Sequence, residues 1–166
     1  IYSVNGYFLG AFPPGEKDLK KTMTVYTNMV RGHAAAYRAI KAAQPEARVG
    51  IAQHYRGFLP SRPWNPLDRW LAGFMHRLLN DFFPRALATG ILKYPVRSKR
   101  LPGVMGTQDF IGLNYYTEEL VALKPFSFSL KTPGEMFNQR YYPPNAELSE
   151  GGFIANVPDG FSRALD

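Results

Sequence analysis

The sequence has no cysteine among its 166 residues, and only three histidines. The absence of cysteine excludes disulfide bonds and thiolate metal sites. His33, His54 and His76 stand too far apart for any standard metal-ligand spacing. We therefore expect no metal centre built from these residue types.

Long hydrophobic runs are also missing. No stretch approaches 18 uninterrupted apolar residues, and no signal-peptide pattern opens the chain. Hydrophobic residues make up 45% and charged residues 20% of the sequence, a globular composition. These features predict a soluble cytoplasmic protein with no membrane partner.

The net charge of +7 raises nucleic acid as a possible partner class. The basic residues are scattered, however, and the densest run is Arg97, Lys99 and Arg100. No sequence signature of a nucleic-acid-binding module accompanies them. We therefore expect a solvated basic surface and no nucleic-acid partner.

The first half of the chain predicts a loop followed by a long helix. Residues 1–17 are rich in glycine, proline and aromatic residues, which indicates a shaped loop. From Asp18 to Ala43, apolar residues recur every three or four positions and form one helical stripe. Asp18 is suited to cap the amino end of this helix, and Pro45 lies just beyond its other end.

Two short segments have the character of buried strands. Residues 48–52 are brief and rich in β-branched residues, and residues 109–116 contain an apolar run that suits a strand covered on both faces. Residues 53–64 are expected to be a loop. After the second strand, residues 117–157 show no convincing period and are also expected to be a loop.

A second helix is expected between the strands, and a third near the end of the chain. Asn65 and Pro66 form a clear helix start, with Asp68 three residues after the cap. The apolar stripe continues to about residue 88, and Gly90 provides a left-handed stop. Residues 158–161 indicate another helix start. Alternating helices and strands predict an α/β fold with a parallel sheet.

The segment from Asp109 to Thr117, with the sequence Asp-Phe-Ile-Gly-Leu-Asn-Tyr-Tyr-Thr, resembles the sixth-strand motif of glycoside hydrolase family 1. Four other stretches resemble the family in the same order along the chain. They are residues 6–15, residues 28–37, residues 49–52, and Gly151–Ile154 together with Pro158–Phe161.

This resemblance implies a (β/α)8 TIM barrel with its active site at the carboxyl-terminal ends of the strands. It implies that residues 1–166 are one incomplete segment of that barrel. The segment would run from the helix after strand four, through strand six, to the start of the following helix. The implied activity is that of a β-glucosidase, a retaining hydrolysis of β-glycosidic bonds that uses no cofactor.

The family's acid/base glutamate lies in an Asn-Glu-Pro motif, and its nucleophile lies in a Glu-Asn-Gly motif. Neither tripeptide occurs in this sequence. We therefore expect an internal segment that contains no catalytic glutamate and is not active alone. The alternative is a non-catalytic barrel fragment or carbohydrate-binding piece that covers its sheet edges by self-association.

Three residues are candidates for the site. Asn114 and Tyr116 alternate with Tyr115 along the predicted strand, so they share one face. In the family, the matching tyrosine donates a hydrogen bond to the nucleophilic carboxylate, and the matching asparagine lies beside it. His54 falls where many members place an asparagine near the leaving-group subsite.

Other chemistry-bearing residues have structural interpretations. His33 lies among small alanines in the helix stripe, which indicates a hydrogen-bonded packing histidine. Glu118 and Glu119 are neighbours and would point to opposite faces, so we interpret them as solvated loop charges and not as a catalytic pair. Trp70, Phe74 and Phe82 stand at helical spacing and are expected in the core.

Overall fold

The computed structural model describes residues 2–93, 98–123, 142–152 and 154–165. Arg97 of the basic run and Phe153 of the Gly-Gly-Phe-Ile stretch lie outside these ranges, as does much of the expected long loop. The chain divides into two compact units. One comprises residues 1–53 and 81–113, and the other comprises residues 54–80 and 114–166.

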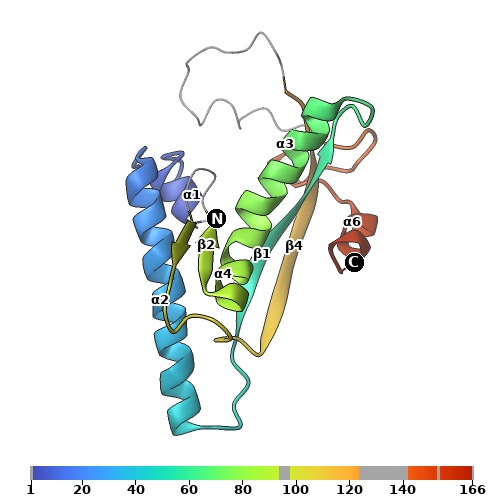
Figure 1. The fold of residues 1–166 in the computed structure, drawn as a ribbon. Helices are drawn as coiled ribbons and strands as arrows, with labels where there is room; N and C mark the ends of the chain where they lie inside the picture. The colour runs from blue at the N-terminus through green and yellow to red at the C-terminus, as the bar shows by residue number, and fades with distance from the viewer. Residues whose placement is uncertain (1, 94–97, 124–141, 153, 166) are drawn as a thin grey trace. The chain divides into compact units, whose positions relative to one another are not determined.

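Helices account for a large part of the described residues (Figure 1). They are α1 (Tyr2–Tyr7), α2 (Leu19–Ala43), α3 (Pro66–His76), the π-helical turn η1 (Arg77–Asp81), α4 (Phe82–Thr89) and α6 (Pro158–Leu165). The long helix, the second helix and the helix near the end of the chain were all predicted. The short α1 was not, because the proline-rich loop that follows it dominates the local sequence.

The described strands form two pairs. They are β1 (Gly50–Pro60), β4 (Phe110–Val121), β2 (Ile91–Lys93) and β3 (Ser98–Arg100). β1 pairs with β4, and β2 pairs with β3 in antiparallel orientation. The sequence did not predict the β2–β3 pair.

β1 and β4 run parallel, as predicted. At their beginnings, the Asp109 N–H donates to the Val49 carbonyl at 2.7 Å. At their far ends, the Ser61 N–H donates to the Val121 carbonyl at 2.8 Å. Both strands are longer than predicted. Residues 53–60 continue β1 where a loop was expected, and β4 runs five residues beyond Tyr116.

In the first unit, α2 supplies most of one side of the core. The Asp18 side chain accepts hydrogen bonds from the N–H groups of Lys20 and Lys21 at 2.7 and 3.0 Å, which confirms the predicted cap. The middle of the apolar stripe packs against α4 and the β2–β3 region. The buried core residues are Tyr26, Val30, Ala34, Phe82, Ala86, Leu87, Leu92, Leu101 and Val104.

His33 has the packing role that the sequence predicts. Its Nε2 atom lies 2.8 Å from the Thr107 carbonyl oxygen, and its ring contacts Phe83 edge-on. The contact joins residues 74 positions apart in the sequence. His33 therefore helps to hold the segment before β4 against α2.

In the second unit, α3 lies along β1 (Figure 1), and Phe58 packs against Ala72 and Met75. Asn65 caps the helix by accepting from the Leu67 N–H at 2.9 Å. Asp68 is fully buried and receives the Arg62 guanidinium at 2.7 and 2.9 Å. It thereby ties the loop before α3 to the helix.

The predicted second helix is helical from Pro66 to Thr89, and it contains a π-helical turn between α3 and α4. Gly90 ends α4 in the left-handed region at φ 68°, as predicted. The core prediction holds for Phe82, which is buried, but is wrong for Trp70, which is 56% exposed and stacks on Phe74. Helical spacing alone did not distinguish the buried from the exposed side of this stripe.

Asp109 connects α2 with the starts of β1 and β4. Its carboxylate accepts from the Tyr37 hydroxyl at 2.9 Å and the Val49 N–H at 2.8 Å, and it pairs with Lys41 at 2.9 Å. The Lys41 ammonium, together with these donors, lowers the pKa of Asp109 from 3.8 to about 2. The charged carboxylate is the form that the fold stabilises.

We predict that Asp109→Asn lowers the urea midpoint of unfolding at neutral pH. A carboxyl with a depressed pKa contributes stability above its ordinary value of 3.8, and this contribution is lost as the pH falls towards about 2. Urea titrations from pH 7 to pH 2 should therefore show that the difference in unfolding midpoint between the unmodified chain and Asp109→Asn becomes smaller as the pH falls. Glu150→Gln, at an exposed site, is the control, and a difference that stays constant with pH would contradict the assignment.

Candidate functional site

The structure brings two of the three predicted site residues into contact. The rings of His54 on β1 and Tyr116 on β4 are stacked, with centroids 4.5 Å apart and planes inclined by 27°. Both residues lie near the middle of paired parallel strands. Asn114 is exposed, and by strand alternation it lies on the same face of β4 as Tyr116.

The imidazole of His54 is held in its neutral form. Burial lowers the pKa of His54 to about 4, and the positive charge of Arg56 adds to this effect. Its Nε2 atom is buried. By contrast, the Tyr116 side chain is 42% exposed, so the tyrosine is the accessible member of the pair.

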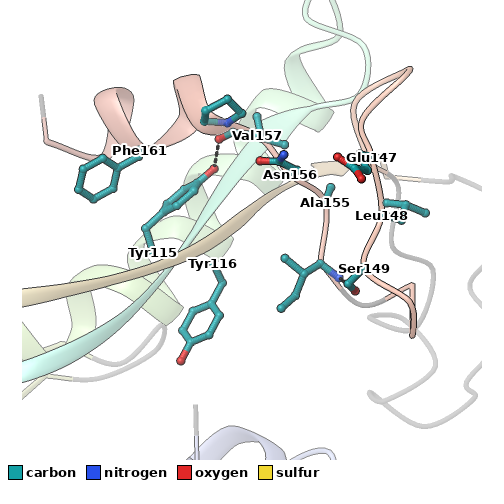
Figure 2. A pocket seen from close by; sticks show the side chains of 11 residues that line it. Tyr115, Tyr116, Glu147, Leu148, Ser149, Ala155, Asn156, Val157 and Phe161 are labelled. Atoms are coloured by element: carbon teal, nitrogen blue, oxygen red, sulfur yellow. Dashed lines mark hydrogen bonds between the residues drawn. The ribbon is translucent and has the colours of Figure 1, made fainter.

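Tyr115 leaves the strand on the opposite side from Tyr116, as the sequence predicts (Figure 2). Its hydroxyl donates to the Val157 carbonyl at 2.8 Å, and its ring contacts Phe161 of α6 edge-on. Burial, and then the charge of Glu118, raises the pKa of Tyr115 to about 12. Tyr115 therefore has a structural role: it anchors the start of α6.

A pocket of about 590 Å³ lies beside the middle of β4 (Figure 2). Its walls combine tyrosine and phenylalanine rings with a carboxylate, an amide and a hydroxyl. The lining residues are Tyr115, Tyr116, Glu147, Leu148, Ser149, Ile154, Ala155, Asn156, Val157, Pro158 and Phe161. No sequence pattern predicted this pocket, because residues 117–157 have no regular period.

The wall opposite β4 is held by the strand itself. The Thr117 hydroxyl donates to the Ala155 carbonyl at 3.0 Å and accepts from the Ala155 N–H at 3.1 Å. Leu148 and Ala155 form an isolated antiparallel bridge, which closes the segment between them into a narrow loop. The Thr117 side chain thus forms the two hydrogen bonds with the Ala155 backbone that a neighbouring strand would otherwise form.

The interpretation of Glu118 and Glu119 as solvated loop charges is wrong. Both lie within β4, Glu118 is 2% exposed, and Glu119 pairs with Arg56. Glu118 receives the Arg163 guanidinium at two oxygens, 3.0 and 2.6 Å away. Because each carboxylate is bound by an arginine, the two do not form a free acid and nucleophile pair.

Close packing explains why Glu118 is buried. A Cβ atom at Gly160 would lie 2.7 Å from the carboxyl carbon of Glu118, and one at Gly57 would also meet this side chain. The glutamate is therefore enclosed between two glycines, one on β1 and one on α6. The sequence did not predict this role for either glycine, because each glycine contacts Glu118 from a distant position in the chain.

Arg56 is a further residue that sequence reasoning missed. The Asn80 side chain pairs with both backbone groups of Arg56: it accepts from the N–H at 3.3 Å and donates to the carbonyl at 2.7 Å. Arg56 itself carries the ion pair to Glu119. Its Nε atom is buried, and no described residue accepts from it. The π-helical turn that presents Asn80 thus supports the strand that carries His54.

The described residues offer no metal centre, since no three of their histidine, aspartate or glutamate side chains gather as ligands. Within the same ranges, no helix combines the length and apolar character needed to cross a membrane.

We predict that Arg163→Met destabilises the chain by about 2 kcal/mol. Removing one partner of a buried pair costs about 3–5 kcal/mol, and this value is reduced because the Arg163 side chain is 49% exposed. Urea unfolding measures the loss, with Arg69→Met as an exposed control on α3. Equal stability of the two variants would show that the Glu118 pair contributes nothing.

We also predict that His54 titrates near pH 4 in an NMR experiment, below its ordinary value of 6.5. Because the unfolded chain binds this proton more readily, His54 makes stability fall as the pH decreases from 6.5 to 4. Arg56→Gln should move the midpoint towards 6.5, whereas Arg77→Gln should not. A midpoint of 6.5 in the unmodified protein would contradict the burial of this ring.

Comparison with known proteins places this geometry in a family. The model of glycosyl hydrolase family 1 matches residues 1–166. Beta-glucosidase A of Acetivibrio thermocellus is 24% identical over 99% of this chain and 38% of its own length. The 1,4-beta-D-glucan glucohydrolase of Thermotoga neapolitana is also 24% identical, over 76% of this chain and 32% of its own length.

Solved structures agree. The beta-glycosidase from Pyrococcus horikoshii superposes with a TM-score of 0.80 at 26% identity, over 99% of this chain and 36% of that protein. The family 1 β-glucosidase from Thermotoga maritima gives 0.79 at 23% identity, over 98% of this chain and 37% of that protein, which shows the shared fold. The same T. maritima enzyme has been solved in complex with glucoimidazole.

The similar structures are (β/α)8 barrel enzymes, and the chain spans between 36% and 38% of the first relative of each kind. Its mixed α/β architecture with a parallel β1–β4 pair is that of part of such a barrel. The match of the family model along the whole sequence confirms the resemblance first seen in residues 109–117. This chain belongs to glycosyl hydrolase family 1.

Proposed function

We propose that this chain forms one section of a β-glucosidase-type active site, in which β1 and β4 are the fifth and sixth strands of the barrel. Residues 1–166 would be a single incomplete barrel segment, starting with the helix after strand four and ending at the start of the helix after strand six. The observation that carries the proposal is the cluster of His54, Asn114 and Tyr116 on paired parallel strands. Family 1 enzymes build their site at the carboxyl-terminal ends of the barrel strands.

The reaction proposed for the complete barrel is retaining hydrolysis of β-glucosides. One glutamate protonates the leaving oxygen and a second attacks the anomeric carbon, with the two carboxyls about 5–5.5 Å apart. Neither glutamate motif occurs in these residues. We assign Tyr116 to hydrogen bonding of the nucleophilic carboxylate and Asn114 to the position beside it. His54 belongs to the same site, on the neighbouring strand.

The partner proposed is a β-glucoside or another β-linked sugar, and the location is the cytoplasm. No cofactor, nucleic acid or membrane takes part in this proposal. The aromatic and polar walls of the pocket beside Tyr116 support a sugar partner, because ring faces and hydroxyl-binding groups are the chemistry that sugars require.

We predict that the chain binds cellobiose and that Tyr116→Phe weakens this binding about fivefold. Tyr116 lines the pocket, so without the nucleophilic carboxylate its hydroxyl would bond the sugar, and the net contribution of one such hydrogen bond is about 1 kcal/mol. Titration followed by amide NMR gives the affinity and shows whether the shifts gather near the middle of β1 and β4. Tyr2→Phe, at an exposed tyrosine of α1, is the matched control.

Shifts that gather elsewhere, or none at high cellobiose concentration, would contradict the proposal. An aryl β-glucoside assay tests the catalytic part, since the chain alone should not turn over this substrate. Turnover that survives further purification and is lost on Glu118→Gln would show that these residues contain their own acid.

A second function, a non-catalytic fragment that self-associates, has one observation in its favour. In the described part of the chain, β1 and β4 pair only with each other, so each has an edge without a neighbouring strand. Sedimentation velocity distinguishes the two functions. A mass that rises with concentration supports self-association, whereas a monomer that unfolds cooperatively counts against it.

A further inference from the structure

The contact between His54 and Tyr116 defines the role of the histidine more closely. The two rings are stacked with a centroid distance of 4.5 Å, so one face of the imidazole is covered by the tyrosine. The Nε2 atom of His54 is buried. A covered face and a buried nitrogen leave the imidazole poorly placed to stack on a sugar or to bond its hydroxyls.

Tyr116 has the opposite properties. Its side chain is 42% exposed, and it lines the pocket beside the middle of β4. The hydroxyl oxygen of a tyrosine lies on the long axis of the ring, so the rotation about the Cα–Cβ bond decides where it points. An exposed tyrosine therefore needs a fixed neighbour if its hydroxyl is to point in one direction.

We propose that His54 is a positioning residue, a flat support on β1 that fixes the ring of Tyr116 on β4 through the stack. This inference rests on the proposed function, in which Tyr116 is the group that acts. In this role, His54 contacts Tyr116 and does not bind the sugar or the leaving group.

The surroundings of His54 suit this role. Its backbone continues into Arg56, whose N–H and carbonyl are both held by Asn80 and whose side chain pairs with Glu119 of β4. The support is therefore carried by a strand that is fixed two residues beyond His54. Burial and the charge of Arg56 keep the imidazole neutral, so the stack is a contact between two uncharged rings.

Three substitutions at one position separate support from direct contact. His54→Phe keeps a flat ring without nitrogens, His54→Ala removes the ring, and His54→Asn introduces the amide that the family resemblance suggests. Trp64→Ala is the control, because it removes another aromatic ring of the same unit at a site that is 78% exposed. The amide spectrum of each variant reports whether the fold is retained.

The first measurement follows the ring protons of Tyr116 by NMR and does not involve a sugar. With His54 or Phe at this position, they should carry the upfield shift of a stacked ring and show contacts to residue 54. In His54→Ala and His54→Asn, they should move to the values of an unrestrained tyrosine. Unchanged shifts in a folded His54→Ala protein would overturn the proposal.

The second measurement is cellobiose affinity. His54→Ala should bind cellobiose about fivefold more weakly, because losing an aromatic pair of ordinary strength corresponds to a change of this size. His54→Phe should bind cellobiose like the unmodified chain. Equal losses for Phe and Ala would mean that the imidazole nitrogens contact the sugar, which overturns the inference. If the unmodified chain binds no cellobiose, the proposed function fails, and the Tyr116 signals alone decide the role of His54.

Discussion

The parallel pairing of β1 with β4 is the interaction on which the described structure depends. Hydrogen bonds join the two strands at both ends, from Val49 with Asp109 to Ser61 with Val121. At the start of the strands, the Asp109 cluster connects them to α2. The His54–Tyr116 stack joins the two strands near their middle.

Buried carboxylates paired with arginines hold the connecting segments to these strands. Asp68, Glu118 and Glu119 are each paired with an arginine, which offsets the cost of removing the charges from water. Two of the pairs link segments far apart in the sequence, from Arg56 to Glu119 and from Glu118 to Arg163. Each of these ion pairs forms in only one alignment of the two segments that it joins, so the pairs also help to fix that alignment.

The chain belongs to glycosyl hydrolase family 1, and it spans 38% of the length of Beta-glucosidase A of Acetivibrio thermocellus. The chain contains neither glutamate motif of the family, and we propose that its side chains contact a sugar or orient a catalytic group. The stack of a neutral histidine on an exposed tyrosine is a feature of these residues themselves.

The sequence by itself determined the family, the alternation of three helices with β1 and β4, the Asp18 and Asn65 caps, and the Gly90 stop, because these depend on local spacing and backbone preference. It also placed Tyr115 and Tyr116 on opposite sides of one strand. Only the tertiary structure decided that His54 meets Tyr116, that Glu118 is buried between Gly57 and Gly160, and that Trp70 is exposed. Those outcomes depend on contacts between residues distant in the chain, and no local pattern records them.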